Sequence, residues 1–148
     1  MSTLVLTIRE SMRYRGRSGH LSWIAHRISG LAILSFLIIH VWDTANANFW
    51  PSAYEWSIEV FKHPLFAIGE IALMAAVLFH AFNGIRITIL DFKPELWKHQ
   101  ARSATIVWVL FFIVFIPIAI LMFNELWHGC ADRGAACWQF PNPADFIN

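Results

Sequence analysis

Histidines and arginines stand in two short stretches of an otherwise apolar sequence, and these are the residues that could do chemistry. Residues 80–91 read HAFNGIRITILD, which places His80 six positions before Arg86. Residues 23–30 read WIAHRISG, which places His26 directly before Arg27. An imidazole in hydrocarbon costs free energy unless it pairs, so a histidine inside an apolar run is a candidate functional residue.

His80 has small neighbours along its own helical face. Steps of four residues lead from Ala72 and Ala76 through His80 to Gly84. This stripe fits close helix packing, with His80 as a hydrogen-bonding residue between helices. It also fits a flat haem macrocycle that lies against the small residues, with His80 as an axial ligand of the iron.

His40 is a further histidine in an apolar run, at a different depth. If Asp91 marks one membrane surface, His80 lies about 16 Å from it, near the middle of the membrane. His40 is 18 residues beyond Ser22, which puts it about 27 Å from the same surface. The two histidines then differ by about 10 Å in depth and are not expected to bind one iron together. A haem with two axial ligands would need its second ligand from a partner subunit.

The pair His26–Arg27 and the more distant Arg86 are expected near the same membrane surface. Arginine presents fixed donors that are always charged, so these side chains could hold haem propionates or another polar headgroup. The alternative is that both arginines extend to the lipid headgroups and only orient their helices.

Membrane-spanning helices are the elements that must position these residues. The 148-residue chain is 57% hydrophobic and 14% charged, with a mean hydropathy of +0.52. Three apolar runs, at about 23–42, 65–90 and 104–127, are long enough to cross a hydrocarbon core of roughly 30 Å. They do not alternate in the manner of barrel strands. We therefore expect an all-α membrane protein with three transmembrane helices, folded as a single domain over residues 1–148.

Two segments flank the expected spans. Residues 43–64 mix aromatic and polar side chains, which predicts a short helix in the membrane interface. Residues 128–148 form a tail with two cysteines, Cys130 and Cys137. In an oxidising compartment these cysteines could close a small disulfide loop, and the alternative is two free thiols.

The basic residues predict the orientation of the chain. Nine of the eleven Lys and Arg residues precede the first span, lie at its start or surround the connection between the second and third spans. By the positive-inside rule the N-terminus is cytoplasmic and the C-terminus is outside. The net charge of +1 gives no reason to propose nucleic acid as a partner beside the membrane lipid.

The two polar stretches are similar to motifs of one known family. WIAHRISG resembles the pattern Ser-x-x-His-Arg-x-Ser/Thr-Gly, and HAFNGIRITILD resembles His-x-x-x-Gly-Ile-Arg followed by Asp. Spacing, order and the three-span layout agree over about residues 20–127. The chain thus resembles the cytochrome b membrane-anchor subunit of succinate dehydrogenase, complex II.

The resemblance implies a cofactor, a substrate and partners. His80 matches the axial ligand of haem b, Arg27 matches an arginine that lines the quinone pocket and approaches a haem propionate, and His26 matches the neighbouring propionate contact. The implied partners are an iron–sulfur subunit, a flavoprotein subunit and a second membrane anchor. The subunit would pass electrons to ubiquinone or menaquinone in the bacterial cytoplasmic membrane. It would not oxidise succinate itself, because the sequence has no flavin fingerprint and no cysteine cluster.

Two positions depart from the family pattern. Trp23 replaces the serine four residues before the arginine, and Ser22 stands one position earlier, about 100° around the helix. Ser22 and Trp23 are the candidates for further quinone contacts, and a helix N-cap is the alternative role of Ser22. His40 resembles the ligand of a second, outer haem in two-haem members, or else it is a structural histidine bonded to a neighbouring helix. Asp43 could orient its imidazole in either case.

Other functions fit some of the same residues. A quinol:fumarate reductase anchor would run the same machinery in reverse, and the sequence does not fix the direction. A haem-free structural anchor would use the histidines for packing alone. A transporter or channel subunit is disfavoured, because the charged residues are few and sit at the ends of the spans.

Overall fold

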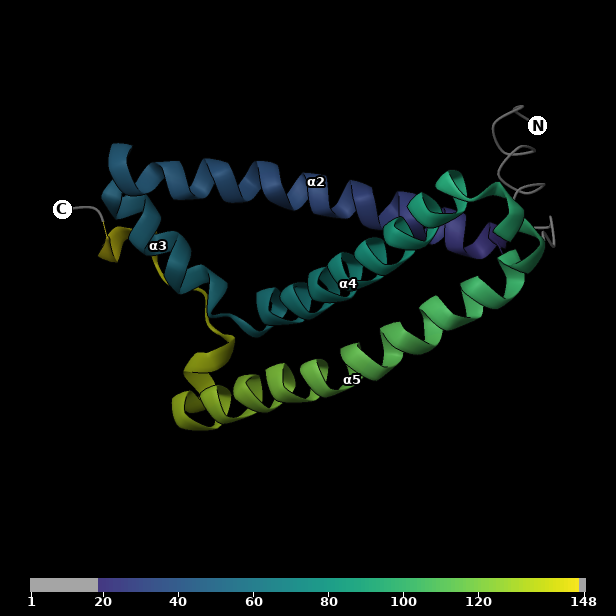
Figure 1. The fold of residues 1–148 in the computed structure, drawn as a ribbon. Coiled ribbons are helices and arrows are strands. Elements are labelled where there is room, and N and C mark those ends of the chain that lie inside the picture. Colours follow the sequence, from purple (N-terminus) through teal and green to yellow (C-terminus); the bar gives the residue numbers. More distant parts are fainter. Residues whose placement is uncertain (1–18, 147–148) are drawn as a thin grey trace, which may run out of the picture.

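Three long helices dominate the computed structural model, which describes residues 19–146 (Figure 1). These are α2 (Gly19–Phe49), α4 (Pro64–Phe92) and α5 (Gln100–Arg133). A shorter helix, α3 (Pro51–Phe61), joins α2 to α4, and a 3-10 helix, η1 (Pro94–His99), joins α4 to α5. The three spans are long and apolar enough to cross a membrane, so the predicted all-α fold is confirmed. We call the two ends of the bundle the η1 end and the α3 end.

Prolines stand at the start of three of the helices. Pro51, Pro64 and Pro94 lie in the first turns of α3, α4 and η1. A missing N–H costs nothing at that position, because the first amides of a helix have no partner within it. The buried side chain of His63 caps α4, since its Nδ1 accepts a hydrogen bond from the backbone N–H of Leu65.

The helices extend beyond the apolar runs that predict them. α2 continues to Phe49, so residues 43–49 are helical and the predicted separate segment, α3, begins only at Pro51. α5 likewise continues to Arg133 and includes the first residues of the predicted tail. With 31 residues, α2 is about 46 Å long, which exceeds a hydrocarbon core of roughly 30 Å. An apolar run marks only the embedded part of such a helix.

α4 lies between the other two long helices and packs against both. Its Phe79 packs with Val107 and Phe111 of α5, and the Phe79 and Trp108 ring centroids are 4.7 Å apart. α2 and α5 separate toward the α3 end, where α3 and the last part of the chain lie between them (Figure 1). The close packing of all three long helices is therefore concentrated at the η1 end.

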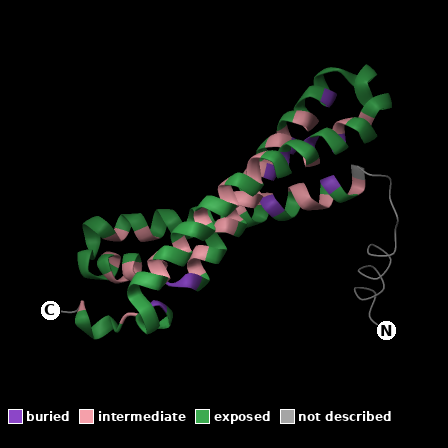
Figure 2. Cartoon of the chain, turned by 90° about the horizontal axis from the view of Figure 1, so that it is seen from below, coloured by how far each residue is buried: buried purple, intermediate pink, exposed green. Residues whose placement is uncertain are grey.

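Most of the described side chains are exposed (Figure 2). Among the large apolar ones, Leu31, Ile38 and Ile113 are 67%, 63% and 62% exposed. So many exposed large apolar side chains would be unfavourable in water, and they mark surfaces that contact lipid or other chains.

Cys130 and Cys137 form a disulfide, which is one of the two alternatives that the sequence left open. It ties the last turns of α5 to a 3-10 helix, η2 (Gly134–Trp138), and Gly134 turns the chain there with a φ of 54°. The chain then runs past the start of α4 to η3 (Pro143–Asp145), and the ring of Phe140 stacks on His63 with centroids 4.1 Å apart. The tail and the α3–α4 corner thus form one cap at the α3 end.

Candidate functional site

His80 of α4 packs against α2, and its ring nitrogen Nδ1 is held there. Nδ1 lies 3.1 Å from the backbone O of His26 and 3.2 Å from Oγ of Ser29. The Ser29 hydroxyl itself donates to the His26 carbonyl at 2.9 Å. All three contacts are satisfied when Nδ1 carries the proton and donates to both oxygens. Nε2 then keeps a free lone pair, and it makes no hydrogen bond within residues 19–146.

His26 stacks on His80, with ring centroids 3.9 Å apart and an interplanar angle of 10°. Two glycines make room for the pair. A Cβ at Gly30 would lie 2.9 Å from Cε1 of His80, and a Cβ at Gly84 would lie 3.6 Å from Cε1 of His26. Nδ1 of His26 is buried and finds no hydrogen-bond partner in the described part of the chain.

The stack also corrects the predicted difference in depth between His80 and His40. His26 and His40 are 14 residues apart on α2, which corresponds to about 21 Å along the helix. Since His80 stacks on His26, it lies about 21 Å from the level of His40, and the sequence-based value of about 10 Å is wrong. That value measured each helix from an assumed membrane surface, whereas both helices extend beyond the apolar runs. The conclusion that the two histidines do not share one iron is unaffected.

Arg27 and Trp23, two residues predicted to contact quinone, lie together on an exposed face of α2. Cζ of Arg27 is 3.9 Å from the centroid of the Trp23 ring, which is the geometry of a cation–π contact. Trp23 is 48% exposed. Both side chains are thus accessible to a ligand or to another chain.

Ser22 lies inside α2, because the described helix already begins at Gly19. The proposed N-cap role of Ser22 is therefore wrong. Its side chain is fully buried, and its Oγ accepts a hydrogen bond from Nε1 of Trp108 at 3.3 Å. Its backbone O accepts a second one from Nδ2 of Asn83 at 3.4 Å. Ser22 therefore connects α2 to both neighbouring helices.

Arg86 has a role that the sequence did not predict. Its Nε donates to Oγ of Ser103 at 2.9 Å, its Nη1 to Oδ1 of Asn83 at 3.2 Å and its Nη2 to the backbone O of Gln100 at 3.1 Å. The guanidinium ties α4 to the start of α5 instead of extending to the headgroups. Asn83, three residues earlier on the same face of α4, is the signal that could have indicated this network.

A cavity of about 240 Å³ adjoins this network at the η1 end. Its lining includes Trp23, Trp97, Asn83, Arg86 and Gln100. Aromatic walls with a few polar groups are typical of a site for a flat, mostly apolar ligand that carries polar atoms.

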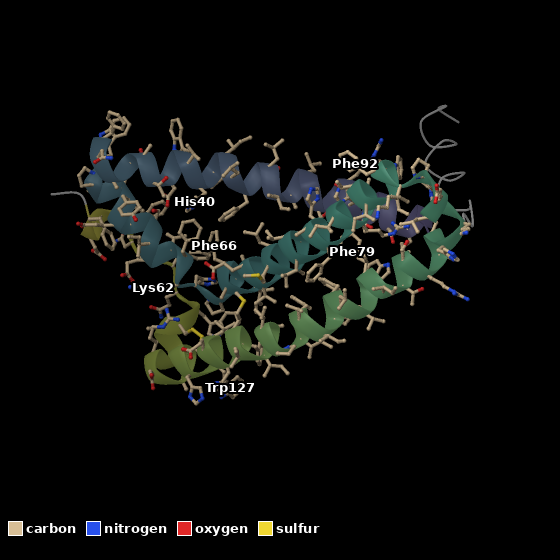
Figure 3. The ribbon with its side chains drawn as sticks, in the orientation of Figure 1. His40, Lys62, Phe66, Phe79, Phe92 and Trp127 are labelled. Carbon is tan, nitrogen blue, oxygen red and sulfur yellow. A yellow bond between two sulfur atoms is a disulfide. The ribbon has the colours of Figure 1, made fainter. Side chains whose placement is uncertain are left out.

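His40 lines a different cavity, of about 410 Å³, at the α3 end. Its exposed ring stacks on Phe36 with centroids 5.4 Å apart, and Phe66 of α4 borders the same cavity (Figure 3). Asp43 and Glu70 also line it. In the described structure, no hydrogen bond joins the side chains of His40 and Asp43.

Comparison with known proteins identifies the family. The model of the succinate dehydrogenase/fumarate reductase transmembrane subunit family matches residues 8–121. The chain belongs to this family. The succinate dehydrogenase 2 membrane subunit SdhC of Mycobacterium tuberculosis is 36% identical over 132 residues, which cover 86% of this chain and 97% of that relative. The succinate dehydrogenase hydrophobic membrane anchor subunit of Archaeoglobus fulgidus is 30% identical over 104 residues, which cover 70% of this chain and 88% of the archaeal one.

Membership in the succinate dehydrogenase/fumarate reductase family has direct consequences. The predicted resemblance to a complex II membrane anchor is confirmed. The chain is an integral protein of the bacterial cytoplasmic membrane, and it is a subunit that associates with the other subunits of an enzyme complex.

Proposed function

We propose that this chain is the haem b-binding anchor of a succinate:quinone oxidoreductase and that it helps to pass electrons from an iron–sulfur subunit to a membrane quinone. The bonding of His80 is the observation that carries this proposal. Metal-ligating histidines commonly donate their other ring N–H to a backbone carbonyl, which fixes the tautomer and the ring orientation. His80 has this arrangement toward His26, and its Nε2 is suited to be an axial ligand.

The surroundings of His80 support the same cofactor. Nδ1 of His26 is buried without a partner, which is costly for a polar atom. A propionate of the haem would supply the missing acceptor, and Arg27, the next residue, would supply a charge to balance it. When bound, haem b stores and transfers single electrons.

The second axial ligand of a six-coordinate haem would come from another subunit. The His26 ring is stacked face to face on His80, and two rings in this arrangement cannot approach opposite faces of one iron. Residues 101–127 contain no histidine. We therefore propose a second membrane anchor as a partner, in addition to the iron–sulfur and flavoprotein subunits.

The quinone site is proposed at the η1 end, around the cavity beside Trp23 and Arg86. Arg27 would stabilise the negative charge that develops on a quinone oxygen during reduction, and Trp23 would offer a flat apolar surface to the ring. Ser22 would contribute indirectly, because its backbone carbonyl accepts a hydrogen bond from the side chain of Asn83, which lines the cavity. Ubiquinone and menaquinone both fit this description.

Haem content of the purified complex tests the role of His80. His80→Leu removes the ligand and keeps an apolar side chain, so we expect an assembled complex that has lost most of its haem b. His40→Leu is the matched control, because it removes a histidine about 21 Å away along α2. Unchanged haem in His40→Leu would fit a single haem, whereas a halved content would assign a second haem to His40. Full haem content in His80→Leu would contradict the proposal.

Two electron acceptors separate the role of Arg27 from assembly. Arg27→Ala should lower the rate of quinone reduction by at least about tenfold, because a charge-stabilising donor is lost. Succinate oxidation with a soluble artificial acceptor should stay at the wild-type rate, since that reaction bypasses the membrane site. Equal losses with both acceptors would indicate misassembly and would count against this assignment.

A haem-free structural anchor is the second candidate, and the His26–His80 stack itself favours it. The two rings already fill the space beside Gly30 and Gly84. This candidate predicts a complex without a haem band. A quinol:fumarate reductase anchor belongs to the same family and would be recognised by a faster rate of fumarate reduction than of succinate oxidation.

A further inference from the structure

Two apolar grooves meet at Arg102 on α5. The larger, of about 610 Å³, lies between α4, η1 and α5, and the smaller, of about 440 Å³, runs along α5. Both are lined by Arg102, Ile106 and Leu110. These three residues recur every four positions and so form a ridge along one face of the helix. The grooves lie along this ridge and share its cationic end.

The shared end of the grooves is positively charged. His99 and Arg86 also line the larger groove, and neither groove is lined by Asp or Glu. Arg86 is already bonded to three neighbours within the protein. The Arg102 side chain, in contrast, makes no hydrogen bond or ion pair with any described residue, so it is available to an external anion.

The remainder of the grooves is suited to hydrocarbon. Ile85, Ile106 and Leu110 are 59%, 57% and 45% exposed. From Arg102 to Leu110 the ridge rises by about 12 Å from the start of the third span toward its middle. The charged group therefore lies near the headgroup level and the apolar walls lie deeper, which is the polarity of a phospholipid.

We propose that Arg102 binds the phosphate of an anionic phospholipid whose two acyl chains occupy the two grooves. One cation at the junction of two apolar grooves matches one headgroup with two chains. A quinone has a single tail and would leave the second groove empty. The planar, permanently charged guanidinium suits phosphate, and basic pockets beside transmembrane helices are a known form of lipid headgroup site. His99 adds a donor at the entrance to the larger groove.

Native mass spectrometry of the assembled, delipidated complex tests the site. The complex is titrated with dioleoylphosphatidylglycerol and, separately, with dioleoylphosphatidylcholine. We expect one phosphatidylglycerol to bind more tightly than phosphatidylcholine. Arg102→Gln should weaken that binding about five- to tenfold, because one charge contact near the surface is lost. Lys93→Gln is the matched control, since Lys93 is an exposed cation at the same end that lines neither groove.

A second variant tests the acyl-chain part of the site. Leu110→Trp keeps Arg102 and fills the deep end that both grooves share, so it should also weaken phosphatidylglycerol binding in an assembled complex. Equal affinity of the wild type for the two lipids would overturn the proposal. Unchanged phosphatidylglycerol binding by Arg102→Gln would also overturn it, as would a protein chain seated in both grooves in a structure of the complex.

Discussion

His80 can lie against α2 only because residue 30 has no side chain. A Cβ at Gly30 would be 2.9 Å from Cε1 of His80, which is closer than such atoms approach, so the imidazole would have to move. Gly30→Ala should therefore lower the haem content of the complex or shift its absorption band. The visible spectrum and the haem content of the purified variant measure this.

Gly84→Ala is the matched control for Gly30→Ala. Its Cβ would meet Cε1 of His26 at 3.6 Å, an ordinary contact, so the spectrum should stay close to that of the wild type. Both substitutions exchange glycine for alanine within a helix and gain about the same helix propensity, so the difference between them reports the contact with the ring. Identical spectra from the two variants would argue against a haem held by His80.

The sequence indicates which residues belong to the candidate site, whereas it does not indicate how they pair. The motifs WIAHRISG and HAFNGIRITILD single out His26, Arg27 and His80. The stack of His26 on His80 depends on the rotation and relative height of two helices, which neither motif contains. Ser29 was missed, although it stands three residues after His26 and so lies on the same helical face.

At the scale of the elements, the Arg86 network should stabilise the contact of α4 with α5. Arg86→Ala removes two hydrogen bonds to α5, those to Ser103 and Gln100, and interhelical hydrogen bonds in membranes contribute about 0.6 kcal/mol each, or about 1 kcal/mol together. The complex should then dissociate at a lower temperature, as measured by size-exclusion chromatography after heating. Arg86→Lys keeps the charge without the forked donors and should give an intermediate value. Unchanged heat stability of Arg86→Ala would show that the network contributes little.

The elements themselves were predictable in number and approximate position, and less so at their ends. Apolar runs locate the three spans because lipid selects for them. They do not locate Phe49 or Arg133 as helix ends, since a helix can continue in polar surroundings. The Cys130–Cys137 disulfide was one of two open alternatives, because the spacing of two cysteines does not reveal whether a turn such as that at Gly134 brings them together.

At the scale of the whole molecule, the orientation of the chain is a prediction from its basic residues. Lys62→Cys places a thiol at the α3 end, and Lys93→Cys places one at the η1 end. A membrane-impermeant maleimide should label Lys62→Cys in intact cells and Lys93→Cys only after permeabilisation. The native cysteines are paired with each other and should not react without a reductant. The reverse labelling pattern would invert the proposed topology and move the quinone site to the outer side.

The molecule as a whole is an incomplete bundle, and this fits an anchor that functions within a complex. α2 and α5 separate toward the α3 end, and large apolar side chains such as Leu31 remain exposed. Arg27 and Trp23 lie on an exposed face of α2 as well. The proposed haem and quinone sites would thus be completed by other subunits, which a single sequence cannot describe.

The reduced-minus-oxidised visible spectrum of the purified wild-type complex shows whether His80 holds a haem b. Haem b is quantified against the flavin of the flavoprotein partner. A b-type band at about one haem per flavin is the predicted result, with His80 as the ligand contributed by this chain. A flavin-containing, assembled complex without a haem band would contradict the account and leave His26 and His80 as a packing pair.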